Sequence, residues 1–281
     1  MESAVLKSLP RLSAGLGCLL FSLCSSAFAQ NIDARPAGGV GAGCLASLSL
    51  ISAIEAANPA AVALSDGLTA AVGGVLPFGL ADLAEVAGAA DVPTPLAHVG
   101  VRVGRSGGEL SHYCTFGGWV ARRWGRVSAG VAYYGVTHSL AYAESGASSY
   151  SVTGVAVRPA DAWLLSLTVK NVEGRGLRRA GREEDIPTTL WAAASWRAPL
   201  YFTLCAELEK ESGREAVAHI GVSLQPCERL RFTAGFSSLG RQICAGVGYD
   251  WVAMGVYASV AHHFALGVTS AALLTFHPQW L

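Results

Sequence analysis

The sequence predicts an all-β protein: a transmembrane antiparallel β-barrel of about 14 strands, with a short N-terminal plug or hatch segment. Three observations predict this fold. They are an apolar, charge-poor composition, a period-two alternation of side chains, and connections that alternate in character along the chain. Charged residues make up only 14% of the 281 residues and hydrophobic residues 52%, against roughly 25% charged residues in an ordinary soluble domain. The chain therefore needs a lipid or partner surface.

The composition also excludes other classes. Beyond the N-terminus no uninterrupted apolar run of about 20 residues occurs, which disfavours a bundle of membrane-spanning helices. An apolar protein without such helices is either a soluble β-sandwich or a membrane barrel. The 20 basic and 20 acidic residues balance to a net charge of zero, so we expect no nucleic-acid partner.

The N-terminus has the pattern of an export signal. Lys7 and Arg11 precede an apolar stretch that ends in Ala27-Phe28-Ala29, the small-x-small pattern of a signal-peptidase site. We predict that residues 1–29 are a cleaved signal peptide; the alternative is an N-terminal anchor helix. An export signal followed by a barrel implies the outer membrane of a two-membrane (diderm) bacterium.

Alternation is clearest in "PLYFTLCAELE". Leu204, Ala206 and Leu208 fall on one face and Thr203, Cys205 and Glu207 on the other, because successive side chains of a strand point to opposite sides. Similar stretches predict about twelve strands between residues 95 and 276. Residues 68–79 read as another strand, and residues 40–51 as either a strand or part of an internal plug. The predicted organisation is a plug segment over residues 30–66 and a barrel over residues 67–281.

The connections separate a barrel from a sandwich. Short turns are predicted at residues 123–125, 158–161, 197–199, 225–228 and 249–250. Longer or more polar connections are predicted at residues 105–111, 139–148, 171–187, 211–215 and 237–240. Counted back from the last strand, every short turn falls on the same side, as in outer-membrane barrels. The tryptophans beside these turns predict an aromatic girdle at one membrane interface; they are Trp124, Trp163, Trp196 and Trp251.

The N-terminal segment carries a recognisable motif. A glycine-rich stretch contains Gly38, Gly39, Gly41 and Gly43, and is followed by Asn58, Pro59 and Ala60. This run resembles the start of the FadL-like outer-membrane β-barrel superfamily, which includes long-chain fatty acid transporters and PorV/PorQ-type proteins. The resemblance implies that the segment enters the barrel as a plug or hatch.

The Asn-Pro pair has a physical reading of its own. Pro59 lacks a backbone donor and disfavours the helical conformation at Asn58, so a helix ends here. The Asn58 side chain can then bond nearby backbone and hold a tight corner. A simple helix-to-strand turn is the alternative reading.

Charged residues on the polar faces of neighbouring strands are predicted to face the lumen. They are Lys170, Glu207, Glu209, His219, Arg229 and Arg231. On the lipid face an Arg or Lys at mid-depth costs roughly 2–4 kcal/mol, so we place them inside. Two readings remain open: a charge network that braces the wall, and a polar constriction that filters a solute.

Enzymatic signals are poor. The glycines of the N-terminal stretch follow no apolar strand and precede no lysine, so they are neither a dinucleotide fingerprint nor a P-loop. The pair His262-His263 lacks a further ligand at metal-binding spacing, and the five cysteines beyond residue 29 are scattered. We therefore expect no enzyme, no cofactor and no metal site.

The sequence predicts a passive transporter of small hydrophobic or amphipathic molecules. The expected partners are outer-membrane lipid and a hydrophobic small-molecule ligand, with the oligomeric state open. The rival reading, which the resemblance supplies, is a non-transporting scaffold or accessory component of protein secretion, as in PorV-type proteins. A third reading is an exported soluble β-sandwich.

Overall fold

The computed structural model describes residues 37–43, 45–50, 52–179, 182–198, 201–238 and 241–277. The predicted signal peptide over residues 1–29 lies outside the described residues and stays a prediction. Residues 34–281 form one compact unit. Its short helices are α2 (Ala37–Val40), η1 (Ala53–Glu55), α3 (Pro59–Val62), η2 (Pro77–Gly79) and η3 (Ala81–Leu83). None of the described helices has the length and apolar character needed to cross a membrane.

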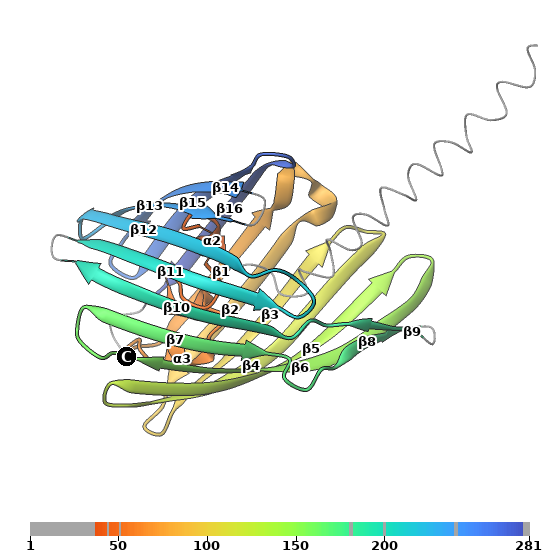
Figure 1. The fold of residues 1–281 in the computed structure, drawn as a ribbon, viewed down its shortest axis with the longest axis horizontal. Coiled ribbons are helices and arrows are strands. Elements are labelled where there is room, and N and C mark those ends of the chain that lie inside the picture. The colour runs from red at the N-terminus through yellow and green to blue at the C-terminus, as the bar shows by residue number, and fades with distance from the viewer. Residues whose placement is uncertain are drawn as a thin grey trace, which may run out of the picture. The chain divides into compact units, whose positions relative to one another are not determined.

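Fourteen antiparallel strands close into a barrel (Figure 1). They are β1 (Thr69–Leu76), β2 (Glu85–Pro93), β3 (His98–Gly107), β4 (Ser111–Trp124), β5 (Val127–Leu140), β6 (Ala143–Val157), β7 (Trp163–Lys170), β10 (Thr189–Ala198), β11 (Phe202–Glu211), β12 (Val217–Cys227), β13 (Leu230–Ser237), β14 (Gln242–Asp250), β15 (Met254–His263) and β16 (Gly267–Phe276). Each pairs with its neighbour, and β1 pairs with β16 to complete the ring. A hairpin of β8 (Gly176–Arg179) and β9 (Arg182–Asp185) branches from β6.

The predicted fold class and strand number are confirmed. Twelve of the barrel strands lie between residues 95 and 276, and β1 lies within the strand predicted at residues 68–79. The fourteenth strand is β2, which pairs with β1 and β3. Residues 40–51, for which strand and plug were both open, contain no described strand.

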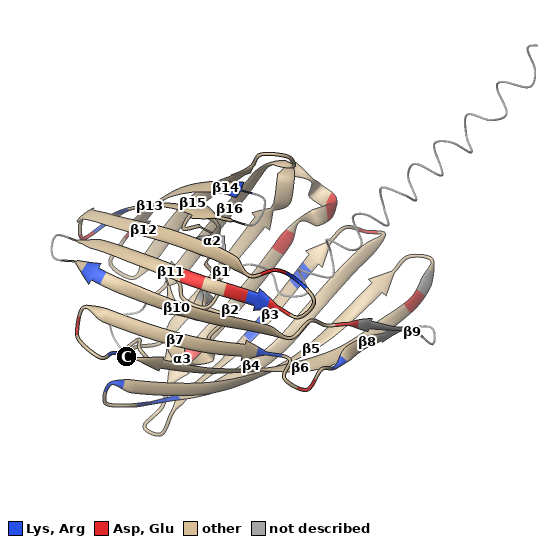
Figure 2. Ribbon diagram, viewed as in Figure 1, with Lys and Arg blue, Asp and Glu red and all other residues tan. Residues whose placement is uncertain are grey.

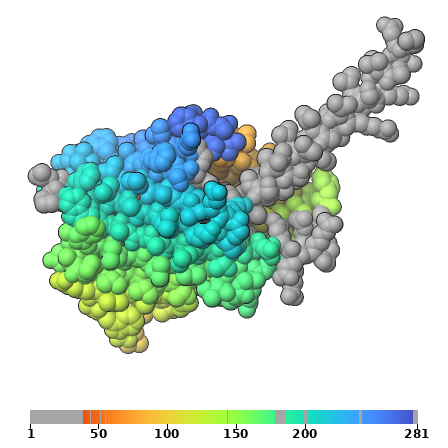
Figure 3. Space-filling view, viewed as in Figure 1, coloured from red at the N-terminus to blue at the C-terminus, as the bar shows by residue number. Residues whose placement is uncertain are grey.

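The wall has an apolar outer face and a more polar inner face. In β15 the outward Val256 and Val260 are exposed, whereas the inward Tyr257 and Ser259 are buried. The outward side chains of β7 and β10–β13 pack into a continuous surface in Figure 3, and most charged residues of the barrel lie near the strand ends (Figure 2). A soluble sandwich would press its apolar faces together. Here the apolar faces point away from the enclosed space, which excludes the sandwich.

The two ends of the barrel differ less in loop length than predicted. The end that we call the turn end carries the connections 94–97, 125–126, 158–162, 199–201, 228–229 and 251–253. Every predicted short turn overlaps or adjoins one of these connections. The opposite, loop end includes residues 77–84 and the hairpin-bearing residues 171–188, but also the two-residue connection 141–142. Strands β5 and β6 have 14 and 15 residues and take up much of the predicted loop 139–148.

The predicted girdle tryptophans all lie near the turn end. Trp124 and Trp251 are 54% and 67% exposed, which places them on the outside. Trp163 and Trp196 face each other across β7 and β10, with ring centroids 6.3 Å apart. An amphipathic ring at this level suits a membrane interface. Two further tryptophans, Trp119 and Trp191, are buried instead.

We expect an outward substitution to reveal the membrane depth of the wall. Ile220 lies near the middle of β12 with half of its surface exposed, so Ile220→Arg places a cation in the hydrocarbon region and costs roughly 2–4 kcal/mol. Met254→Arg, at the turn end of β15, costs about 0–1 kcal/mol because it lies near the interface. Denaturant unfolding from phospholipid vesicles measures both. Equal costs would show that the outer face does not contact hydrocarbon.

Candidate functional site in the barrel lumen

Part of the chain that precedes β1 lies against the inner face of the wall. We call residues 39–65 the lumen segment. Its described residues 39–43 and 45–48 are buried. Backbone groups of Ala42 and Gly43 lie directly beside Gly221 on β12 and Gly235 on β13, where a Cβ atom would overlap them. The wall thus uses glycine where the segment comes closest.

The glycines of the lumen segment also lie where the segment comes close to the wall. Gly43 has φ = +82°, a conformation that side chains disfavour, and a Cβ on it would overlap the carbonyl oxygen of Ile220. A Cβ on Gly41 would lie 2.6 Å from Cβ of Ser259. The Gly39 carbonyl accepts a hydrogen bond from Ala42 N at 3.0 Å and closes a turn. The glycine-rich stretch therefore allows close backbone contact with the wall.

The Asn58-Pro59 pair begins α3, whereas the sequence predicted that it ends a short helix; η1 before it ends at Glu55. The Asn58 side chain caps the helix by accepting a hydrogen bond from Ala60 N at 2.9 Å, and its amide donates to Val155 O at 3.3 Å. Pro59 occupies the first helical position, where no backbone donor is needed. The carbonyl of Ala60 accepts from Ser128 Oγ at 2.9 Å. This corner is thus fastened to β5 and β6.

Glu207 is the main anchor on the opposite side. Its carboxylate accepts hydrogen bonds from Ala46 N at 2.9 Å, from Ser47 N at 2.7 Å and from the Ser47 hydroxyl. The Glu207 side chain is only 3% exposed. Three donors offset the desolvation of the buried carboxylate, and in return the carboxylate satisfies two backbone donors of the irregular segment.

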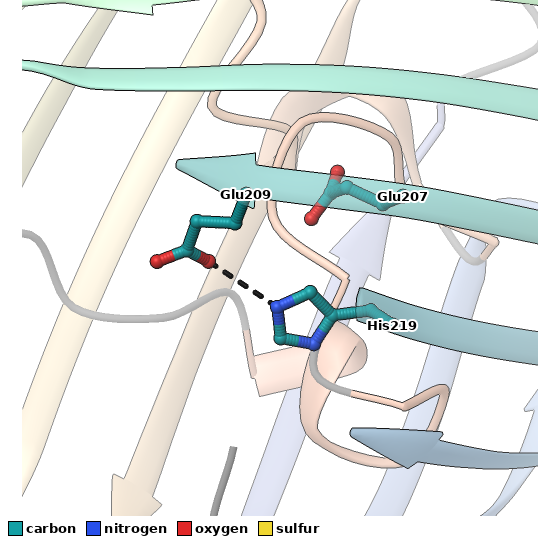
Figure 4. A group of neighbouring side chains, drawn as sticks. All are labelled: Glu207, Glu209 and His219. Carbon is teal, nitrogen blue, oxygen red and sulfur yellow. Dashed lines mark ion pairs between the residues drawn. The ribbon is translucent and has the colours of Figure 1, made fainter. Parts of the chain in front are cut away.

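His219 lies directly opposite Glu207 in the β11–β12 pairing. Because a carbonyl oxygen only accepts, His219 Nδ1 donates to Gly43 O, at 3.0 Å. On the other side of the ring, Nε2 lies 3.3 Å from a carboxylate oxygen of Glu209. Figure 4 shows the three side chains converging beneath β11 and β12.

Arg231 anchors a third part of the segment near the turn end. Its guanidinium donates to the carbonyl of Leu50 and lies 3.6 Å from Asp250, which also accepts from the Tyr257 hydroxyl. Lys170 also faces inward and is 5% exposed; its ammonium lies 4.8 Å from the ring centroid of Tyr150.

Arg229 does not lie where the sequence placed it. It is exposed and belongs to the turn between β12 and β13, not to the inner face of a strand. The predicted alternation continues from Arg231 back to Arg229, but the strand does not, because β13 begins at Leu230. The other five predicted lumen residues face the barrel interior, and Glu207, His219 and Arg231 contact the lumen segment.

A cavity of about 630 Å³ opens between the lumen segment and the turn end of the wall. Its lining includes Leu48, Leu64 and Leu164, together with Arg158, Arg197 and Arg231. The guanidinium groups of Arg158 and Arg197 form no ion pair or hydrogen bond within the described part of the chain. Burial, and then repulsion from Arg123 and Arg197, lowers the pKa of Arg158 below its ordinary value. An anionic group would relieve this repulsion.

Sequence reasoning missed these two arginines. Both lie at strand ends that were assigned to short turns, so they were not counted on an inner face. The available signal was the alternation itself: Gly154, Ala156 and Arg158 continue one row of β6.

The similarity of this chain to known proteins lies in its fold. No protein-family model matches the sequence, and no curated protein is significantly similar to it. Among solved structures, a deletion mutant of TodX, described as a monoaromatic hydrocarbon channel, is 9% identical and superposes with a TM-score of 0.63, covering 88% of this chain and 99% of that one.

Two further structures agree. The Pseudomonas putida toluene transporter TodX is 10% identical, with a TM-score of 0.61 over 85% of this chain and 95% of that chain. The Acinetobacter baumannii outer membrane protein Omp33 is 9% identical, with a TM-score of 0.50 over 77% of this chain and 100% of that chain. At these identities the similarity shows the fold alone. The chain has the closed β-barrel fold of these outer-membrane proteins.

Proposed function

We propose that the chain is an outer-membrane channel for the passive passage of small hydrophobic or amphipathic, fatty-acid-like molecules. In this proposal the N-terminal signal peptide directs export of the chain. The observation that carries the proposal is the cavity at the turn end, which combines leucine side chains with two guanidinium groups that have no hydrogen-bond or ion-pair partner among the described residues. Such a lining suits a molecule with an apolar body and an anionic end. The fold shared with TodX, a toluene transporter by its description, supports passage of this kind.

The lumen segment controls this passage. Residues 39–43 and 45–48 are buried against the wall, and in this proposal a solute crosses the barrel when the segment shifts. The segment is irregular backbone inside a barrel, where lipid does not reach it. It therefore acts as a movable plug, fastened at Glu207, at Arg231 and at the Asn58 corner.

The same fastening supports a second candidate function. A segment held by three donors on one buried carboxylate suits a permanently closed barrel, which serves as a scaffold or accessory component of protein secretion. Flux separates the two functions. We expect vesicles that contain the protein to take up a medium-chain fatty acid faster than empty vesicles, and to take up a disaccharide no faster. Absence of flux for every solute favours the scaffold.

The two cavity arginines provide a sharper test. We expect Arg158→Ala/Arg197→Ala to lower the uptake of laurate roughly tenfold, because a cleft lined by one sign of charge concentrates the opposite ion. Uptake of the neutral dodecanol remains unchanged. Vesicle uptake assays measure both solutes.

Arg126→Ala is the matched control. Arg126 lies at the same end of the barrel, but it is exposed and already pairs with Asp161 at 3.7 Å. An equal loss of laurate and dodecanol uptake in the double variant, or a comparable loss in the control, would contradict an anion-selective cavity.

A further inference from the structure

We propose that Glu207, Glu209 and His219 form a binding site for a divalent first-row metal ion such as Zn²⁺, and that the bound ion fastens the lumen segment to the wall. One ligand atom from each of the three residues lies within 4.8 Å of the others. Glu207 and Glu209 are two positions apart on β11, so both carboxylates lie on its inner face. The strand register places the His219 imidazole across from Glu207. The site differs from the His262-His263 pair, at which the sequence predicts no metal.

The hydrogen-bond geometry of His219 carries the proposal. Nδ1 holds a proton, because it donates to Gly43 O at 3.0 Å. In the neutral ring Nε2 then carries a lone pair and can only accept a hydrogen bond. It lies 3.3 Å from a carboxylate oxygen of Glu209, and an ionised carboxylate likewise only accepts. The ring is fully buried, and Nε2 has no hydrogen-bond partner among the described residues. In this neutral form two acceptors face each other in a buried site, and a cation between them removes the repulsion.

The surroundings have the form of a metal site's outer layer. A metal-bound histidine usually donates its other ring N–H to a carbonyl or carboxylate, and ligating carboxylates are themselves hydrogen-bonded. Here Gly43 O holds Nδ1, and Ala46 N and Ser47 N hold Glu207. Among the described residues, no lysine or arginine pairs with Glu207.

The donor set indicates the class of ion. Carboxylate and imidazole donors bind Zn²⁺, Mn²⁺ and Fe²⁺. Ligand atoms around a tetrahedral Zn²⁺ lie about 3.4 Å apart, so the three side chains need only a modest inward rotation. Water or a further group would complete the coordination. The alternative occupant is a proton: an imidazolium paired with Glu209 satisfies Nε2 without a metal.

The ion would act on the lumen segment because the outer layer of the site belongs to that segment. Binding draws His219 and Glu207 together and so holds Gly43, Ala46 and Ser47 against the wall. This consequence for passage rests on the proposed function, but binding itself does not. With Zn²⁺ we expect lower flux, and with a chelator higher flux.

The test uses the full chain purified in detergent, stripped with a chelator and titrated with Zn²⁺ alone by calorimetry at pH 7.5. We expect saturable binding of one ion, weakened at least about tenfold in Glu209→Gln and in His219→Gln. A heat-modifiable gel shift verifies that each variant forms the barrel. The control, His262→Gln/His263→Gln, alters the outer histidine pair and binds Zn²⁺ as the unaltered chain does.

A second readout is amide hydrogen exchange, in which Zn²⁺ slows exchange at residues 43–47. Absence of saturable binding would show that a proton, not a metal, occupies the site and would overturn the proposal. So would binding that disappears only in the His262/His263 variant, or exchange at residues 43–47 that Zn²⁺ leaves unchanged. A chain that binds Zn²⁺ and gains protection but passes no solute even after the metal is stripped with a chelator disproves the channel and leaves the metal site standing.

Discussion

Gly221→Ala/Gly235→Ala increases the conductance of the barrel in planar lipid bilayers. The added Cβ on Gly221 would overlap the carbonyl oxygen of Ala42, and the one on Gly235 would lie 2.5 Å from Cα of Gly43. Overpacking a well-packed contact costs typically 1–3 kcal/mol at each site, and here the cost falls on the closed arrangement of the lumen segment. The population of the displaced arrangement rises by at least about tenfold.

The control for this experiment is Gly104→Ala. Gly104 lies on β3, and its added Cβ would come no closer than 3.5 Å to the nearest atoms, an ordinary van der Waals contact. Its conductance stays that of the unaltered chain. If the double variant folds, as a gel shift shows, and its conductance does not rise, the lumen segment is not what closes the barrel.

Glu207→Ala has the second large effect. It leaves Ala46 N, Ser47 N and the Ser47 hydroxyl without their buried acceptor, and each unsatisfied group costs about 1–3 kcal/mol. The segment then detaches locally while the wall persists, since the wall strands remain paired on both sides. We expect faster hydrogen exchange at residues 45–48 and higher conductance. A chelator in both samples removes any contribution from bound metal.

Glu211→Ala serves as the matched variant on the same strand. Glu211 lies at the end of β11 and pairs with Arg214 at 3.0 Å, away from the contacts of the segment. Exchange at residues 45–48 remains slow in this variant. Slow exchange in Glu207→Ala as well would mean that the glycine contacts alone hold the segment.

The sequence predicts the positions of some residues of the site and not of others. The inward orientation of Glu207, Glu209 and His219 followed from alternation, because neighbouring side chains of a strand point to opposite faces. Arg229 marks where that inference ends: alternation does not say where a strand stops, and the turn of β12–β13 begins at Glu228. For the same reason Arg158 and Arg197, at strand ends, were missed.

Other features needed contacts that are distant in the sequence. Glu207 binds Ser47 across 160 positions, and His219 binds Gly43 across 176. The glycine-rich stretch predicted an unusual segment, and its resemblance to FadL-like barrels implied a plug. The partners of its glycines, Gly221 and Gly235, carried no local signal, since a glycine in a strand has several explanations.

By itself, the sequence determined the class of wall, the number of strands, the face on which most side chains lie and the break at Asn58-Pro59. These features are local: they arise from the two-residue period of a strand and from the missing donor of proline. Only the tertiary structure decided which inward groups meet. Strand register and closure of the ring set the height and neighbours of each side chain, and so created the carboxylate–imidazole cluster and the arginine-lined cavity.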